Sequence, residues 1–473
     1  MRNTVLATAV AATLALAAPQ AFAQAKGAAS KAEVQAIEAQ MKALADRLSR
    51  LESANSALKT QNDELQAVVE RRDAEIDYLK EQTKELREEG AVLASEASKV
   101  KGADWATKIK ARGDLRYRHE WIDPERVVSG SADDAADRTR HRIRARLGFD
   151  AKVTDNAKVT LLLATGGDDP RSSNQTLGSQ GTRKSIGIDM AYADWTFMQG
   201  GNLILGKQPY PFYRPGQSLF FDGDYNPEGG AVKFERGMLF GSAYGWWLSE
   251  QYNANPAGEN SDGNIFGGQL GLKFGLFGGE SRIALHYYDC GACQNEASIM
   301  YANNGNGNTT YQVRRTTTIG NTNTTPPVPV VSTTTTNYLT YDYQVLQVSG
   351  DIGLVLFDLP FTFWADYANN MADDVEYDTA YGVGAVLGKA SNAKSWEAGI
   401  GWQSIDADAL FGQLVDSDFG DGRTDSEGWF LKGGYAPVKN ITLNATYFIN
   451  TLNKDVGTEL DYNRLQLDVN YKF

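Results

Sequence analysis

Apolar and polar residues alternate along the last nine residues of the chain. One set of alternate positions is apolar and the other is polar: Leu465, Leu467, Val469, Tyr471 and Phe473 against Gln466, Asp468, Asn470 and Lys472. Successive side chains of a strand point to opposite faces, so one face of this strand is apolar and the other is wet. Such a strand suits a wall between lipid and water, and the pattern predicts the closing strand of a transmembrane barrel. An edge strand of a soluble sheet is the alternative interpretation.

Similar alternating runs follow one another from Trp105 onward, with connections that are alternately short and long. The runs predict strands that start near Lys108, Thr139, Asn156, Ser185, Asn202, Gly229, Leu239, Ile265, Ser281, Tyr338, Pro360, Thr379, Ser395, Ser426, Asn440 and Leu460. An even number of strands returns both ends of a barrel to the periplasmic side of a bacterial outer membrane. We therefore predict an all-β transmembrane barrel of about 16 antiparallel strands over residues 108–473, with about 18 strands as the alternative. The longest connection, 290–337, is rich in Asn, Gly and Thr and is predicted to be a mobile surface loop.

Nearer the amino-terminal end, apolar residues recur at intervals of three and four, which is the spacing of a coiled coil. One heptad position holds Val34, Met41, Leu48, Val69 and Ile76, and the other holds Ile37, Leu44, Leu51, Leu58, Leu65, Leu79, Leu86 and Leu93. We predict an α-helical coiled coil over residues 30–93 and a linker over 94–107. Asn55 and Asn62 occupy consecutive core positions, where polar residues fix register and strand number. The pattern thus predicts pairing with copies of the same helix; a helix packed against its own chain is the alternative.

Residues 1–23 have the pattern of a secretory signal peptide. Arg2 precedes an apolar run from Thr4 to Ala18, and Ala21-Phe22-Ala23 forms a small-x-small cleavage site. We predict an exported chain whose mature form starts near Gln24. The mean hydropathy of −0.40 is compatible with a barrel, whose strands are only half apolar. Because the formal net charge is −13, we do not expect a partner of nucleic acid.

The two cysteines, Cys290 and Cys293, stand close together as Cys-Gly-Ala-Cys among loop residues. Since oxidation is expected in an exported protein, the spacing predicts a local disulfide. A thioredoxin-like site would need a helix that starts after a buried strand, and a zinc site would need two further ligands that are not found nearby.

The first two predicted strands carry cationic faces. On the first, Lys108, Lys110, Arg112, Asp114, Arg116, Arg118 and Glu120 alternate with apolar residues, and on the second Arg138, Arg140, Arg142, Arg144 and Arg146 do so. A charged residue that faces lipid costs a few kcal/mol, so these faces are predicted to line the lumen. We interpret the stripe as a positive field that favours anions or orients dipolar solutes. A solvated wall without a selective role is the alternative.

The third outward connection, over residues 209–228, is rich in Pro and aromatic residues and ends in a cluster of acids. Its candidate constriction residues are Tyr210, Phe212, Tyr213, Arg214, Asp222 and Asp224. Proline and aromatic side chains limit the flexibility of such a segment. If the loop folds inward, Asp222 and Asp224 would face the arginines across a narrowed pore. An ordinary surface loop is the alternative.

Taken together, these motifs resemble a family of bacterial outer-membrane porins. The likeness rests on the segment from Ile109 through the Arg-rich second strand, on the strand 203–208 before the third loop, and on Tyr471-Lys472-Phe473. It implies passive diffusion of small hydrophilic solutes or ions through a lipid-embedded barrel. The even strand count, in turn, predicts that the coiled coil lies in the periplasm. The resemblance also implies a homotrimer, although the core residues of the helix do not separate two strands from three. It does not supply a particular solute.

Other functions compete with transport. A long periplasmic rod would suit a structural tether that contacts peptidoglycan, and tether and pore can coexist. An enzyme is not expected, because His119, His141 and His286 are the only histidines and none has a recognisable nucleophile motif beside it. No cofactor or metal site is expected either: Asp222 and Asp224 begin like a calcium loop, but Gly is missing from the sixth position.

Overall fold

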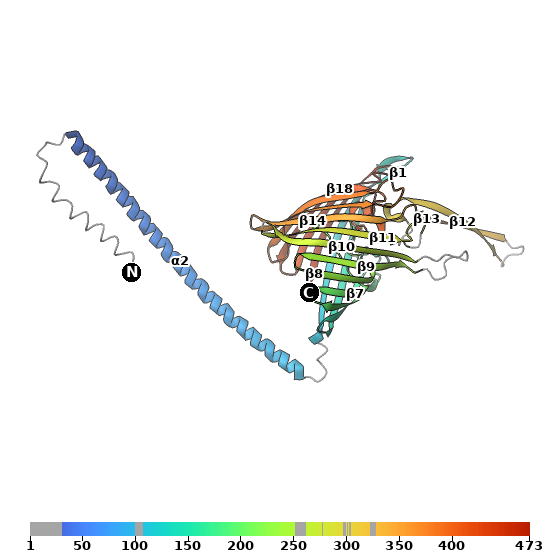
Figure 1. Cartoon of the computed structure of the whole chain (residues 1–473), viewed down its shortest axis with the longest axis horizontal. Coiled ribbons are helices and arrows are strands. Elements are labelled where there is room, and N and C mark those ends of the chain that lie inside the picture. The colour runs from blue at the N-terminus through green and yellow to red at the C-terminus, as the bar shows by residue number, and fades with distance from the viewer. Residues whose placement is uncertain are drawn as a thin grey trace. The chain divides into compact units, whose positions relative to one another are not determined.

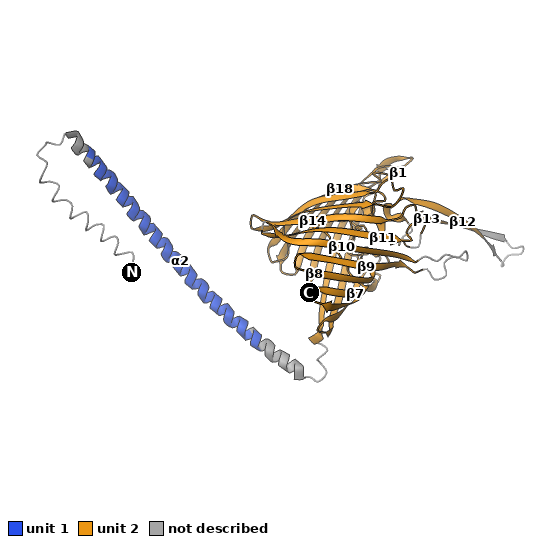
Figure 2. Cartoon of the chain, viewed as in Figure 1, with its two compact units in different colours: residues 1–103 blue, residues 104–473 orange. Residues whose placement is uncertain are grey.

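The computed structural model describes residues 31–99, 107–250, 262–276, 278–296, 299, 301, 304–321 and 328–473. The chain divides into two compact units, residues 1–103 and 104–473 (Figures 1 and 2). The predicted signal peptide and half of the predicted linker, residues 100–106, lie outside the described residues. We describe each unit by itself.

The first unit is one helix, α2 (Lys31–Lys99). It continues through Gly90 and extends six residues beyond Leu93, into the stretch that the sequence pattern assigned to a linker. Its apolar heptad residues from Met41 to Leu79 are exposed; Met41 is 67% and Leu58 is 63% accessible. An apolar stripe that remains uncovered in a helix is typical of a surface that another helix covers. No helix within the described residues is both long and apolar enough to cross a membrane.

The second unit is a sheet in which each long strand pairs antiparallel with the next one along the chain. Its long strands are β1 (Ile109–Val128), β3 (Arg138–Thr154), β4 (Ala157–Thr165), β6 (Ile186–Met198), β7 (Gly201–Lys207), β8 (Glu228–Arg236), β9 (Leu239–Ser249), β10 (Gly263–Leu276), β11 (Gly279–Gly291), β14 (Gln344–Leu356), β15 (Leu359–Asn370), β16 (Thr379–Gly388), β17 (Ser395–Ile405), β18 (Ser426–Val438), β19 (Ile441–Leu452) and β20 (Leu460–Lys472). Strand β1 also pairs with β20, from Asp114↔Lys472 to Pro124↔Tyr462, so the sheet closes on itself. The prediction of a closed barrel of 16 strands is confirmed.

Four further strands lie outside the barrel wall. Strand β2 (Ser131–Asp134) pairs with the far end of β1, and β5 (Gln175–Thr176) pairs with β3. Strands β12 (Thr310–Asn321) and β13 (Val328–Leu339) form a separate hairpin. The predicted barrel strand at Tyr338 was therefore wrong: Tyr338 ends this hairpin, and the next wall strand starts at Gln344. A Thr-rich run favours a strand, but its alternation does not say which strand it pairs with.

The two rims of the barrel differ. Short turns join β3 to β4, β8 to β9 and β18 to β19, at the rim where β1 starts and β20 ends. At the third of these turns Asn440 has φ of +70°, the left-handed conformation that tight hairpins require. The long connections lie at the opposite rim.

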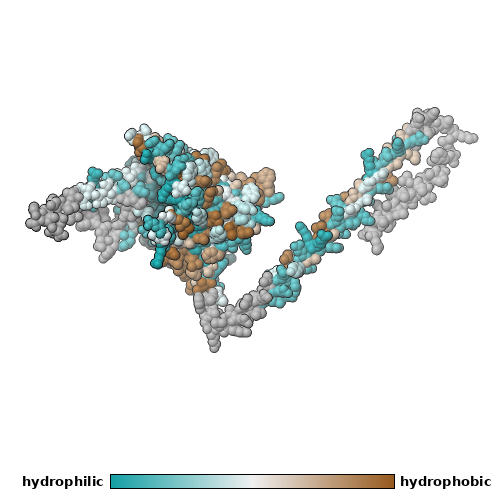
Figure 3. Space-filling model, turned by 180° about the vertical axis from the view of Figure 1, so that it is seen from behind, coloured by the Kyte–Doolittle hydropathy of each residue, from teal (hydrophilic) through white to brown (hydrophobic). Residues whose placement is uncertain are grey.

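The outward face of the barrel is apolar. Leu467 and Tyr471 of the last strand are 42% and 44% exposed, while Arg464 and Gln466 of the same strand are buried in the interior. Figure 3 shows apolar residues, in brown, gathered over the side of the barrel. The alternation read from the sequence thus corresponds to the two faces of the wall.

Candidate functional site

Neighbouring strands β1, β3 and β20 present a cationic face to the lumen. The β1 and β3 register pairs Arg116 with Arg144 and Arg118 with Arg142, so the guanidinium groups form a ladder. Strand β20, which closes the barrel, adds Arg464 beside β1. We call the set the arginine wall: Arg112, Arg116, Arg118, Arg140, Arg142, Arg144, Arg146 and Arg464.

Most of the arginine wall is paired with carboxylates of the same strands. Asp114 accepts hydrogen bonds from Arg144 at 3.0 Å and from Arg146 at 2.8 Å. Nε of Arg118 lies 2.7 Å from Oδ1 of Asp468. The remaining pairs are Arg112 with Asp150, Arg140 with Glu120, and Arg464 with Glu120. Charge-assisted pairs of this kind fix the side chains in place.

The loop between β7 and β8, residues 208–227, lies inside the barrel. The backbone N–H of Tyr213 donates to Gln269 of β10 at 2.8 Å, and its hydroxyl donates to Asp351 of β14 at 2.5 Å. Farther along, the Ser218 hydroxyl donates to Asp366 of β15 at 2.7 Å. Because Asp351 and Asp366 lie on strands far from β7 and β8 in the sheet order, the loop crosses the lumen.

Aromatic packing holds this loop rigidly. The ring of Phe212 lies 4.2 Å from that of His286, and the Arg214 guanidinium sits 4.9 Å over the ring of Tyr210. Gly216 has φ of +45°, and a Cβ there would lie 2.3 Å from the Trp364 ring, so only glycine fits. The predicted constriction residues are thus brought together by the fold.

A second loop also enters the lumen, and sequence reasoning missed it. Residues 406–425, between β17 and β18, are mostly buried and contain two short 3₁₀ turns, Gly412–Leu414 and Phe419–Gly422. The guanidinium of Arg171 donates to the carbonyl oxygens of Gly412, Val415 and Gly422. An apolar run, 409–415, in a connection that should be polar was the available signal.

The two inserted loops are joined directly. The Asp222 N–H donates to the Leu414 carbonyl at 2.7 Å, and the Ser417 N–H donates to the Asp222 carboxylate at 2.7 Å. Burial, followed by the neighbouring Asp416, raises the pKa of Asp222 well above its usual value. The expectation that Asp222 faces the arginines was wrong, because its carboxylate caps backbone N–H groups of Asp224, Tyr225 and Ser417 instead.

Each inserted loop places one acid against the arginine wall. Oδ1 of Asp224 lies 3.3 Å from Nη1 of Arg144. On the second loop, Asp418 lies 3.0 Å from both Arg118 and Arg464. Burial favours the neutral form of Asp418, but the two arginines outweigh it and lower the pKa of this carboxyl. Opposite charges therefore meet where the loops approach the wall.

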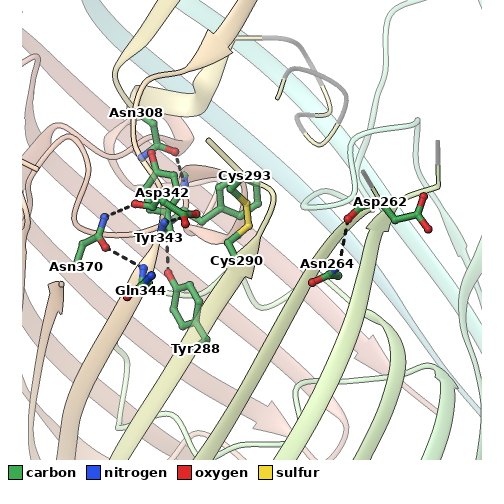
Figure 4. Close-up of a disulfide and its surroundings, with 12 residues drawn as sticks. Asp262, Asn264, Tyr288, Cys290, Cys293, Asn308, Asp342, Tyr343, Gln344 and Asn370 are labelled. Carbon is green, nitrogen blue, oxygen red and sulfur yellow. Dashed lines mark hydrogen bonds between the residues drawn. A yellow bond between two sulfur atoms is a disulfide. The ribbon is translucent and has the colours of Figure 1, made fainter. Parts of the chain in front are cut away.

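The remaining candidate residues lie elsewhere in the barrel. Cys290 and Cys293 are joined by a disulfide at the end of β11, where the Cys290 N–H donates to the Tyr343 carbonyl at 2.9 Å (Figure 4). His286 is buried between Tyr244 and Gln347, with hydrogen bonds of 2.8 Å to each. His141 lies beside Tyr117 and His119 on the alternate face of β1 and β3, away from the arginine wall.

A closed barrel with an apolar outside, a charged lumen and two inserted loops belongs to the class of transmembrane channel barrels. A family model described as "Putative porin" matches residues 125–473. The chain belongs to this porin family. Family and fold together support a channel of the outer membrane.

Solved structures with a similar arrangement are bacterial porins of low sequence identity. Pseudomonas putida OprB at high pH has a TM-score of 0.46 and 12% identity, and the match covers 78% of this chain and 95% of that one. A triple mutant of Rhodopseudomonas blastica porin has a TM-score of 0.40 and 10% identity, with 77% and 100% covered. No curated protein matches the chain.

Proposed function

We propose that the protein is an outer-membrane porin through which small hydrophilic solutes or ions diffuse passively, with a preference for anions. The supporting observation is the cationic face that β1, β3 and β20 present to the lumen, where the eight arginines outnumber the carboxylates paired with them. A wall on which fixed positive charges outnumber negative ones creates a positive field in the water beside it. Such a field attracts anions and orients dipolar solutes.

The preference for anions follows from the balance of charge around the passage. The arginine wall contributes eight positive charges. Six carboxylates pair with it, namely Asp114, Glu120, Asp150, Asp224, Asp418 and Asp468. The difference of eight minus six leaves an excess of two positive charges at this wall.

Reversal potentials in a salt gradient across planar bilayers test the proposal. A variant in which Gln replaces Arg140, Arg142, Arg144 and Arg146 should have a reversal potential that indicates a higher permeability to cations relative to anions. The control replaces Arg314 and Arg315, which are exposed on the β12–β13 hairpin, and should leave it unchanged. No shift in the quadruple variant would exclude these arginines as the selectivity element, and a protein that forms no channels would contradict the porin function.

We further propose that the rim with the short turns faces the periplasm, so that the helix preceding β1 is periplasmic. Its exposed heptad residues, with Asn55 and Asn62 at core positions, support association with copies of itself, as a homotrimer. Cross-linking of intact cells followed by mass determination distinguishes a trimer from a dimer or monomer.

A structural tether is the second candidate function, because a helix of 69 residues is about 100 Å long and could reach peptidoglycan. Deleting residues 24–100 separates the two functions. Unchanged conductance together with a detached envelope would support tethering, whereas a normal envelope would contradict it.

A further inference from the structure

Two members of the arginine wall lack the carboxylate partner that the others have. Six of the eight arginines have a carboxylate within 3.0 Å. Arg142 comes no nearer than 4.0 Å to Glu120, and within the described residues Arg116 has no carboxylate at 4.0 Å or less. The excess positive charge of the wall is therefore concentrated at Arg116 and Arg142.

The same two arginines are held together by a third loop. Strand β5 of the loop 166–185 pairs with β3 at Arg142↔Thr176, which sets the preceding residues against the wall. Nη2 of Arg116 donates to Oδ1 of Asn174 at 2.7 Å, and Nη2 of Arg142 donates to Oγ of Ser172 at 3.2 Å. Asn174 in turn donates to Ser172 at 3.4 Å. Arg116 and Arg142 are diagonal neighbours across the β1–β3 pair, about 7 Å apart.

These groups retain donors that nothing satisfies. The Nε atoms of Arg116 and Arg142 are both buried and have no hydrogen-bond partner among the described residues. The Arg142 side chain is only 12% exposed, so water reaches it poorly. A buried guanidinium with no carboxylate in hydrogen-bond contact is costly, and so is each unpaired buried donor. Two such groups side by side indicate a missing anion.

The arrangement of donors indicates which anion fits. Two guanidinium groups, the hydroxyl of Ser172 and the amide of Asn174 approach from β1, β3 and one loop. Guanidinium groups bind oxyanions through paired N–H donors. A tetrahedral anion offers acceptors in several directions at once, whereas a carboxylate offers only two oxygens in one plane.

We propose that Arg116, Arg142, Ser172 and Asn174 form a binding niche for a free tetrahedral oxyanion, of the class of inorganic sulfate or phosphate. This inference rests on the proposed function of an anion-favouring channel. It specifies one site in that channel at which an anion binds. Bound there, the anion supplies the counter-charge that the wall lacks and joins the loop 166–185 to β1 and β3.

The niche can be tested by measuring the current through the full-length protein in planar bilayers bathed in potassium chloride. Potassium sulfate is then added to this solution in steps. In the natural sequence, sulfate should reduce the chloride current along a saturable curve. In the variant R116Q/R142Q, the half-blocking concentration should rise at least about tenfold, as expected when charge-assisted hydrogen bonds are lost. The control R112Q/R146Q removes the same charge from paired members of the wall and should shift this concentration by less than about threefold.

Calorimetric titration of sulfate into the detergent-solubilised protein separates the niche from the channel function. Channels that conduct but show no saturable sulfate binding would overturn the niche and leave the porin function standing. Equal losses in the R116Q/R142Q and R112Q/R146Q variants would also overturn it, since only a general field would remain. Saturable binding in a protein without conductance would uphold the niche and contradict the porin function.

Further controls test whether the variant has folded and whether planar donors and a tetrahedral anion are required. Heat-modifiable migration on gels shows whether R116Q/R142Q has folded, and R116K/R142K keeps both charges while losing the planar donors. The lysine variant should bind sulfate more weakly than the natural sequence and more tightly than the glutamine variant. Acetate, a planar carboxylate, should block the natural channel more weakly than sulfate, and the reverse order would overturn the choice of a tetrahedral anion.

Discussion

Arg144 of β3 and Asp224 of the β7–β8 loop join the barrel wall to an inserted loop, with Nη1 of the arginine 3.3 Å from Oδ1 of the acid. Asp224 also accepts a hydrogen bond from Ser173 at 3.1 Å. One carboxylate thus contacts both the wall and the loop 166–185. Its charge opposes the field of the neighbouring arginines Arg144 and Arg146.

Replacing Asp224 with Asn should increase the preference for anions. A charge about 7 Å from an ion in water contributes roughly 0.6 kcal/mol, so the permeability ratio should change by roughly threefold. The reversal potential in a potassium chloride gradient measures this ratio. Asp133→Asn, at an exposed position of β2, is the matched control. A shift toward cations would contradict the assigned role of Asp224.

Replacing Tyr213 with Phe should loosen the β7–β8 loop. The substitution removes the hydrogen bond from the hydroxyl to Asp351 and leaves the ring in place. A hydrogen bond to a charged group contributes about 2 kcal/mol, so the loop should leave its docked position more often. Single-channel records should show more open-state noise than for Tyr311→Phe, whose hydroxyl lies on the β12–β13 hairpin. Identical records would mean that this anchor does not hold the loop.

Acidification toward pH 5 should strengthen the docking of the second inserted loop. Burial, followed by the charge of Asp418, raises the pKa of Asp416 to about 6, above the 3.8 of an unperturbed carboxyl. The folded state therefore binds more protons between these values, and its stability rises as the pH falls through about 6. Above this pH the charged carboxylate carries its full destabilising effect.

The measurement is the temperature at which the folded band disappears on gels, at pH 7.5 and at pH 5. Asp416→Asn should raise this temperature at pH 7.5 and reduce the difference between the two values of pH. Asp133→Asn should do neither. A larger pH difference in Asp416→Asn would show that other carboxyls govern the response.

Replacing Asn55 and Asn62 with Leu should stabilise the association of the helix with its copies. It should also make the number of helices in the coiled coil less specific. Each Leu that becomes buried contributes about 2 kcal/mol, and the polar residues that fix register are lost. Thermal unfolding by circular dichroism and sedimentation of residues 31–99 measure both effects. Thr60→Leu, outside the core positions, is the control. No gain in stability would argue against a coiled coil with these residues in its core.

The wall of the barrel could be predicted from the sequence because lipid imposes its pattern residue by residue. Leu239, Ser426 and Leu460 start strands where the alternation placed them. The cationic faces of β1 and β3 could be assigned to the lumen for the same reason, since charge on the lipid side is costly.

The arrangement of side chains inside the barrel could not be predicted, because it depends on contacts between residues that are far apart in the sequence. Arg464 lies 344 residues from its partner Glu120 in the sequence, so no local pattern indicates this pair. Asp222 and Asp224 are two residues apart, yet one caps backbone N–H groups and the other meets the wall. The insertion of residues 406–425 depends in part on Arg171, which is distant in the chain. Tertiary packing, rather than local propensity, decides each of these.

The pairing of β1 with β20 has a consequence for how the protein matures. Asp114 meets Lys472 across the seam, so the two edges that seal the cylinder are separated by almost the whole barrel sequence. Until both are present, each edge exposes unpaired backbone groups that would readily pair with another chain. The seam can therefore form only once the whole barrel sequence has been made, and an unclosed barrel leaves both edges open to pairing with other chains.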